Sequence, residues 1–137
     1  MVDLATRAVA ARPLKTKNGA EVLQQLQDIY TTDPRLKVPQ RMEVDAGTEF
    51  NAAAKWLRAQ GATVRVGRPG RHTQQRAVDN LNRALGTAIA RQQTSEELLT
   101  DNVARHWVSD LQPFVAAVND KWLRMPPPAA DAFDPPR

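Results

Sequence analysis

Two aspartates, Asp45 and Asp79, stand where carboxylates could share a divalent metal ion. Asp45 closes an apolar-rich segment and precedes the small-residue turn Ala46-Gly47, while Asp79 lies 34 positions later, at the start of a strongly periodic helix. A strand end and a helix start can bring two carboxylates together, and paired carboxylates bind Mg²⁺ for phosphoryl transfer. Each aspartate also has a simpler interpretation. Asp45 could form an Asx turn or cap the next helix, and Asp79 could interact favourably with a helix dipole.

Basic residues are concentrated between two acidic positions. The chain has 19 Lys and Arg against 15 Asp and Glu, a formal net charge of +4. No acidic residue occurs between Glu49 and Asp79. That interval contains the cations Lys55, Arg58, Arg65, Arg68, Arg71 and Arg76. A basic block flanked by carboxylates indicates an anionic partner such as nucleic acid, and a solvated basic loop is the alternative.

The amino-acid composition excludes several classes of protein. The 137 residues are enough for one domain with a core, and the absence of cysteine excludes disulfides, Cys-ligated zinc and thiol catalysis. No apolar run approaches the ~18 residues of a membrane span, so we expect no membrane association. Five of the ten prolines fall between Pro126 and Pro136. We therefore predict a domain over residues 1–125 and a Pro-rich tail over residues 126–137.

Hydrophobic periodicity predicts an α/β layer arrangement. The expected strands are residues 2–14, 41–44 and 62–66, with one helix after each of the first two strands and two helices after the third. Asn18-Gly19 should open the first helix, and Gly61 should close the second. A polar break over residues 94–101 should separate the last two helices. Pro113 should kink or split the final helix, which contains Trp107.

Several runs of residues, in order along the chain, match one known family. They are Val2-Asp3-Leu4-Ala5-Thr6-Arg7, Pro39-Gln40-Arg41-Met42-Glu43-Val44-Asp45-Ala46-Gly47-Thr48-Glu49-Phe50, His72-Thr73-Gln74-Gln75-Arg76-Ala77-Val78-Asp79-Asn80-Leu81-Asn82-Arg83 and Phe114-Val115-Ala116-Ala117-Val118-Asn119. With these runs the chain resembles the catalytic core of retroviral and LTR-retrotransposon integrases. The resemblance implies a ribonuclease-H-like fold with a DDE triad of acidic metal ligands.

The resemblance also implies roles for individual residues. Asp45 would be the second catalytic, metal-binding carboxylate and Asp79 the third, and together they would hold Mg²⁺ or Mn²⁺. Gln75 would contact DNA ends, and Arg83 would hold the phosphate backbone. To these nucleic-acid-binding residues we add, from charge alone, Arg65, Arg68, Arg71 and Arg76.

Two positions depart from the family pattern. The family's first aspartate lies on a strand preceding the segment that residues 2–7 resemble, so Asp3 does not match it, and the fold is expected to lack its first strand. The third acidic residue is normally glutamate, and Asp79 is one methylene shorter. We therefore expect Mg²⁺ or Mn²⁺ binding to be weak or absent, and strand transfer, the activity of the parent enzyme, to be impaired.

The sequence is compatible with two functions. The first is a DNA-binding integrase-core fragment of a retroelement, and the second is a domesticated structural or interaction module without catalysis. A generic RNA-binding domain would need aromatic residues on its strands, and the predicted strands contain none. The resemblance further implies a homodimer formed through helices, for which the apolar faces around Trp107 and Trp122 could serve. The expected location is intracellular, and nuclear for a eukaryotic retroelement protein.

Overall fold

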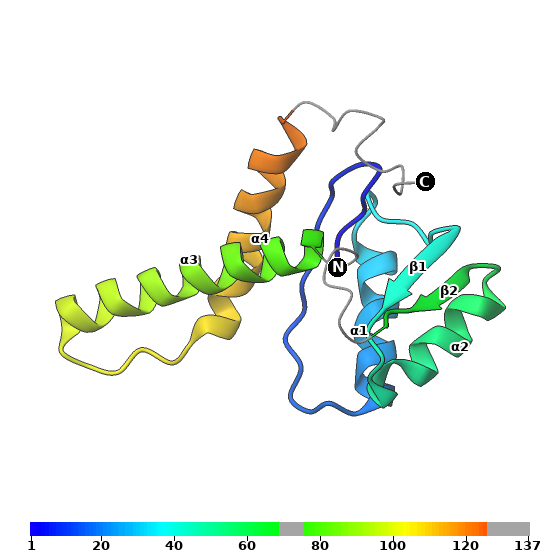
Figure 1. The fold of residues 1–137 in the computed structure, drawn as a ribbon. Helices are drawn as coiled ribbons and strands as arrows, with labels where there is room; N and C mark the ends of the chain where they lie inside the picture. Colours follow the sequence, from blue (N-terminus) through cyan, green and yellow to red (C-terminus); the bar gives the residue numbers. More distant parts are fainter. Residues whose placement is uncertain (69–75, 126–137) are drawn as a thin grey trace.

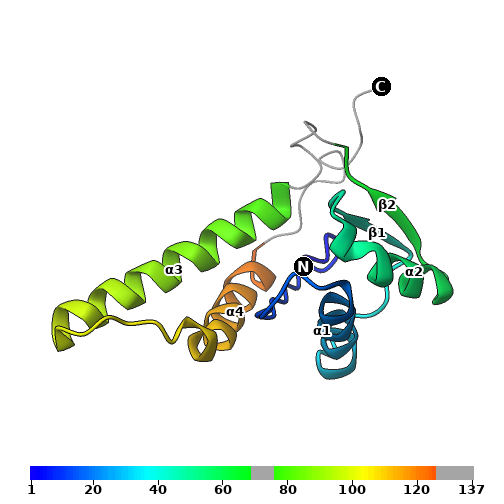
Figure 2. The same cartoon turned by 90° about the horizontal axis from the view of Figure 1, so that it is seen from below.

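The computed structural model describes residues 1–68 and 76–125, which form a mixed α/β protein (Figure 1). The described part contains four α-helices, one short 3-10 helix and a two-stranded parallel sheet. Helices α3 and α4 lie on one side, and α1, α2 and the sheet lie on the other. The N-terminal segment runs between these two sides, as the second view also shows (Figure 2).

The sheet belongs to a strand–helix–strand unit. Strands β1 (Arg41–Val44) and β2 (Thr63–Val66) pair in parallel, with Arg41 opposite Thr63 and Val44 opposite Val66. Parallel strands need a long crossover connection. Here the 3-10 helix η1 (Thr48–Phe50) and α2 (Asn51–Ala59) supply it. Gly61, at φ +89°, turns the chain from α2 into β2 in a conformation that a residue with a Cβ rarely adopts, which confirms it as the end of the helix.

Helix α1 (Gly19–Thr32) begins as the sequence predicts. The Asn18 side-chain oxygen accepts a hydrogen bond from the Ala20 backbone N–H, so it satisfies one of the free donors at the helix start. The helix packs against α2, where the rings of Tyr30 and Trp56 stack at a centroid distance of 6.1 Å. Trp56 is therefore an anchor between two helices.

The prediction of a strand over residues 2–14 is wrong. The segment contains only an isolated antiparallel bridge between Val2 and Val9. Asp3 causes the reversal, because its Oδ1 accepts hydrogen bonds from the backbone N–H groups of Ala5 and Thr6, at 2.9 and 3.3 Å. A side chain that bonds to the nearby backbone favours a turn over an extended ladder.

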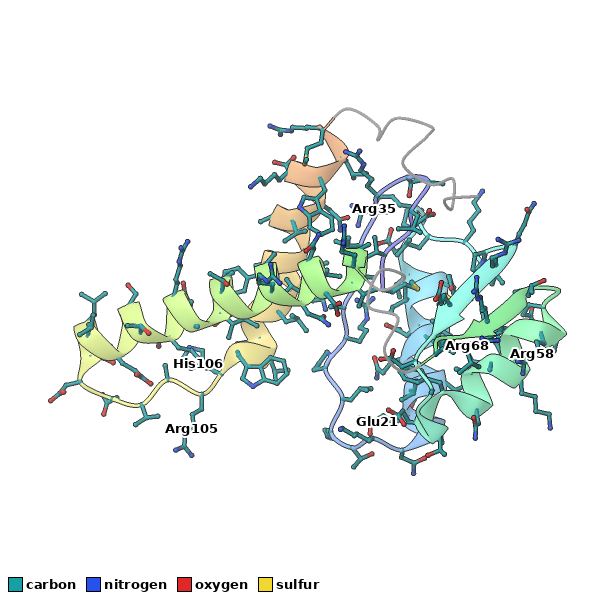
Figure 3. All side chains as sticks on the ribbon, in the orientation of Figure 1. Glu21, Arg35, Arg58, Arg68, Arg105 and His106 are labelled. Carbon is teal, nitrogen blue, oxygen red and sulfur yellow. The ribbon has the colours of Figure 1, made fainter. Side chains whose placement is uncertain are left out.

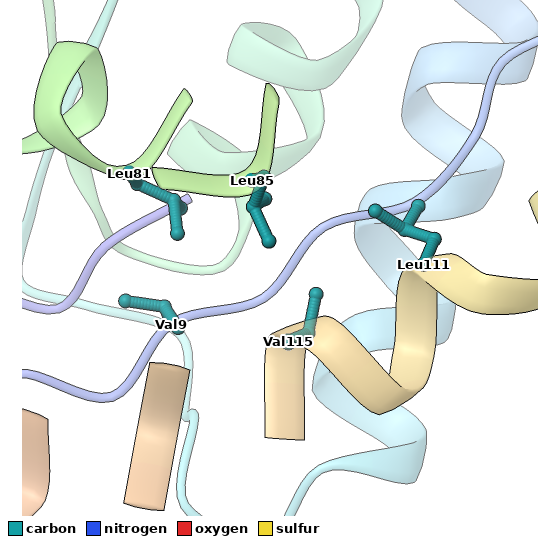
Figure 4. Packing of buried hydrophobic residues seen from close by; sticks show 5 residues of the cluster. All are labelled: Val9, Leu81, Leu85, Leu111 and Val115. Atoms are coloured by element: carbon teal, nitrogen blue, oxygen red, sulfur yellow. The ribbon is translucent and has the colours of Figure 1, made fainter. Parts of the chain in front are cut away.

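The returning part of this segment is the centre of the molecule. Val9 is fully buried in a cluster with Leu81, Leu85, Leu111 and Val115 of the two long helices (Figure 4). Its neighbours Ala8 and Ala10 are buried on the opposite side, in a second cluster with Ile29 and Leu36. Extended backbone alternates its side chains. One short segment therefore joins the two sides of the protein.

Helices α3 (Arg76–Thr100) and α4 (Trp107–Leu123) pack against each other. The predicted polar break over residues 94–101 is wrong, because α3 continues to Thr100. This part of α3 is polar because it is exposed, and residues such as Glu and Leu favour a helix. Pro113 lies inside α4 and does not split it. Its ring is exposed, so water can reach the carbonyl that the proline leaves without an amide donor.

The predicted fold class is correct at the level of a mixed α/β protein. The prediction of a short mixed sheet is wrong. In residues 1–68 and 76–125 the sheet has two parallel strands, and the antiparallel Val2–Val9 bridge lies outside it. Two strands with no fully buried residue form a marginal sheet, which helix α2 supports through its packing against β2. The predicted Pro-rich tail, residues 126–137, lies outside the described residues.

Candidate nucleic-acid interface

A groove of about 480 Å³ separates the N-terminal segment from β1. Residues 1–5 form one wall, and residues 39–43 form the other. Ala77 and Val78, in the first turn of α3, also line it. The start of α3 and strand β1 therefore line one groove, although they are far apart in the sequence. Neither Asp45 nor Asp79 is among the residues that line this groove.

Asp45 directly follows β1, and Asp79 lies in the first turn of α3. Both side chains belong to exposed residues. The two strands run toward the side of the molecule on which α3 begins (Figures 1 and 2). Asp79 is also well placed to interact favourably with the positive end of the α3 dipole without any metal.

The described residues contain no cluster of three potential metal ligands. Among residues 1–68 and 76–125, no group of three or more His, Asp or Glu side chains is arranged to hold a metal ion. Asp3 lines the groove, but its Oδ1 closes the turn at Ala5 and Thr6. Mg²⁺ needs near-octahedral oxygen coordination, and two-metal sites are built from several carboxylates. The carboxylates of the described chain do not fit a two-metal centre.

Arginines surround the same region. Arg65 lies on β2 with Glu43 as its register partner, and Arg68 follows the strand. Arg76 and Arg83 lie on α3, seven residues apart, which is about two turns and therefore one helix face. All four are exposed, and Figure 3 labels Arg58 and Arg68 on the α2–β2 side. The predicted residues Arg71 and Gln75 lie outside the described residues.

The face of α3 that carries Arg76 and Arg83 is opposite its buried face. Leu81 and Leu85 point into the core cluster with Val9. Arg83 is two positions from each of these leucines, and Arg76 is five positions before Leu81. On a helix of about 3.6 residues per turn, these offsets place both arginines well away from the core contact. Arg76 and Arg83 therefore project to solvent from a helix that is held firmly on its other side.

The structural roles of two residues were not predicted from the sequence. Asn119, only 1% exposed, hydrogen-bonds to the backbone of Val9, and Arg12 joins α1 to α4. The Arg12 guanidinium donates to Asp28 at 3.0 Å, to Thr32 at 3.0 Å and to Gln112 at 3.3 Å. A signal for Asn119 was present, because it continues the apolar spacing of Leu111 and Val115 in steps of four. No local sequence pattern indicated that Arg12 joins two helices.

A smaller cavity, of about 360 Å³, lies beside Arg12 and Arg35. Its two guanidinium groups already have carboxylate partners: Arg12 pairs with Asp28 at 3.0 Å and Arg35 with Asp33 at 2.8 Å. These hydrogen bonds from Arg35 also hold the pKa of Asp33 below its ordinary value of 3.8. The cavity therefore offers no uncompensated positive charge to an anionic ligand.

Comparison with known proteins identifies no family. The chain matches no protein-family model and no curated protein sequence. None of the helices in residues 1–68 and 76–125 is long and apolar enough to cross a membrane. Function must therefore be argued from the residues themselves.

Proposed function

We propose that this chain is a DNA-binding domain derived from an integrase-type catalytic core, with a ribonuclease-H-like scaffold and without a complete catalytic metal centre of its own. The observation that carries the proposal is the exposure of four arginines: Arg65 and Arg68 on and just after β2, and Arg76 and Arg83 along the outer face of α3. We name these four residues the arginine surface.

The order of elements supports the finer fold assignment. Residues 2–7, β1 with its following Asp45, the α3 start with Asp79, and α4 with Asn119 occur in the order that the integrase resemblance requires. The groove between residues 1–5 and β1 brings the first of these runs beside the strand that precedes Asp45.

Guanidinium groups suit the phosphate backbone of DNA. They remain charged at all relevant pH values and donate two parallel hydrogen bonds to phosphate oxygens. Binding of this kind releases counterions, so the affinity falls steeply with salt and depends little on base sequence. We expect the domain to bind duplex DNA without strong sequence preference.

Fluorescence anisotropy with labelled duplex DNA at several salt concentrations tests the proposal. The double variant Arg76→Gln/Arg83→Gln should bind more weakly, and its log–log salt slope should be shallower by about 1.8, because each lost phosphate contact removes about 0.9. The matched control is Lys15→Gln/Lys17→Gln, which removes the same charge from exposed positions before α1. Equal slopes in the two doubles, or no salt-sensitive binding by the parent chain, would refute DNA binding through this surface.

Calorimetry with Mg²⁺ and Mn²⁺ tests the metal part separately. We expect at most one weakly bound ion, because the described residues contain no group of three potential metal ligands. Tight binding of two ions that is lost in both Asp45→Asn and Asp79→Asn would instead restore a catalytic centre. The alternative function, an interaction module derived from the same scaffold, gains support if neither DNA nor metal binds.

A further inference from the structure

The N-terminal segment has a backbone edge that its own chain does not pair. On the inner side, backbone hydrogen bonds of 2.9 and 3.0 Å join residues 1–3 to residues 8–10. These bonds make Val2 and Val9 a non-hydrogen-bonded pair, so each residue directs its own N–H and C=O away from the other. Asn119 binds the outward groups of Val9. Within the described part of the chain, no backbone group binds those of Val2.

Strand β1 has a second edge of this kind. In residues 1–68 and 76–125 the sheet consists of β1 and β2, so one edge of β1 faces away from β2. The Thr63 N–H donates to the Gln40 carbonyl at 2.8 Å, and the register places Arg41 opposite Thr63. Alternate residues of a parallel strand bond to the same neighbour, so Gln40 and Met42 bond to β2. Arg41 therefore directs its N–H and C=O to the other edge.

The groove of about 480 Å³ separates these two segments. Val2 and Arg41 both line it, whereas residues 8–10 and β2 do not. Its walls include apolar side chains that are open to solvent, because Leu4 is 52% exposed and Val78 is 38% exposed. Ligand sites in proteins commonly have volumes of roughly 300–1,000 Å³ and mostly apolar walls. The groove therefore has the size of a binding site and a backbone edge on each side.

The residues that line the groove indicate the class of ligand. Asp3 and Glu43 contribute two negative charges, and Lys37 and Arg41 contribute two positive charges, so the formal charges cancel. The lining therefore favours neither a polyanion nor a polycation. An extended peptide presents N–H and C=O groups on both of its sides, and its alternate side chains can lie against apolar walls. A small apolar molecule would leave the polar groups of both edges without partners.

We propose that this groove binds an extended peptide segment of a partner protein, which adds as a strand between residues 1–3 and β1. Strand addition takes its affinity from main-chain hydrogen bonds and its specificity from alternate side chains. A third strand would also stabilise a sheet that has only two. The inference does not rest on DNA binding, because it uses neither Arg76 nor Arg83, and it adds a protein partner to the proposed function.

Selection of a phage-displayed library of random seven-residue peptides on the full chain tests the proposal. Enriched peptides should alternate apolar and polar residues, and a synthetic copy should bind with little dependence on salt, in contrast to DNA. N-methylation of alternate amides in that copy should weaken binding at least about tenfold, because buried carbonyls would lose their donors. A selection without enriched peptides, or equal binding by the N-methylated copy, would overturn strand addition.

Two pairs of variants locate the site. Arg41→Pro removes the N–H that points away from β2, and proline is tolerated at the first residue of an edge strand. It should weaken peptide binding at least about tenfold, whereas Arg41→Ala keeps the N–H and should bind within about twofold of the parent. Leu4→Asp, on the apolar wall, should also weaken binding, and Leu14→Asp, at an exposed leucine outside the groove, is its control. Binding unchanged in both Arg41→Pro and Leu4→Asp would refute this site.

Discussion

The Asn119 carboxamide pairs with the backbone of Val9 as a neighbouring strand would. Its Oδ1 accepts from the Val9 N–H at 2.8 Å, and its Nδ2 donates to the Val9 carbonyl at 2.9 Å, although the two residues are 110 positions apart. Val9 lies between the two core clusters, where water cannot replace these bonds. The Asn119 side chain of α4 thus supplies hydrogen-bond partners for both the N–H and the C=O of Val9.

Removing this pair should strongly destabilise the fold. We expect Asn119→Ala to lower the free energy of unfolding by about 2–4 kcal/mol, because one N–H and one C=O lose their partners in a buried environment. Asn119→Asp should also destabilise, since it places a carboxylate against the Val9 carbonyl. Urea unfolding followed by tryptophan fluorescence measures both effects. The exposed control Asn80→Ala should stay within about 0.5 kcal/mol of the parent.

Two glycine substitutions should have opposite effects. Gly86 lies within α3, and a Cβ added there would meet no atom within 4 Å. Gly86→Ala should therefore stabilise the protein by about 0.5–1 kcal/mol. Gly61→Ala should destabilise it by about 1 kcal/mol, because φ +89° strains any residue with a Cβ. Thermal unfolding of the two variants checks the signs, and two changes of the same sign would contradict these backbone assignments.

Tyr30 should titrate far from its ordinary range. Burial, with a smaller contribution from the negative charge of Asp3, raises the pKa of the Tyr30 phenol to about 12. The neutral phenol is favoured in the fold, so this stabilisation is complete below pH 10 and is lost as the pH rises through about 12. Tyr30 is the only tyrosine, so phenolate absorbance reports it directly. A midpoint near 10, with far-UV circular dichroism still native, would contradict this environment.

The Asp33–Arg35 pair should make stability depend on acidic pH. Hydrogen bonds from Arg35 lower the pKa of Asp33 below 3.8, so the stabilisation is present above that value and is lost as the pH falls through the lowered pKa. Asp33→Asn should cost about 1 kcal/mol or less at neutral pH, and the difference should disappear in acid. Denaturant midpoints at both pH values measure it. Asp120→Asn, in the exposed pair with Arg124, should change stability less at neutral pH.

Local patterns in the sequence determined much of the secondary structure. Asn18 predicted the start of α1, the apolar run before Asp45 predicted β1, and Gly61 predicted the end of α2. These features depend on neighbours within a few residues, so composition and spacing contain the information. The acid-free basic interval is likewise a property of the sequence alone.

Tertiary structure decided what depends on distant partners. The N-terminal segment alternates like a strand, but its pairing depends on α4 and on the Asp3 turn. The end of α3 looks like a polar break because no core covers it, yet it is helical. Whether carboxylates that are far apart in the sequence gather at one site is also decided by the tertiary structure. Contacts between residues far apart in the chain are hard to predict from sequence, because the residues adjacent to each partner do not indicate which distant residue it contacts.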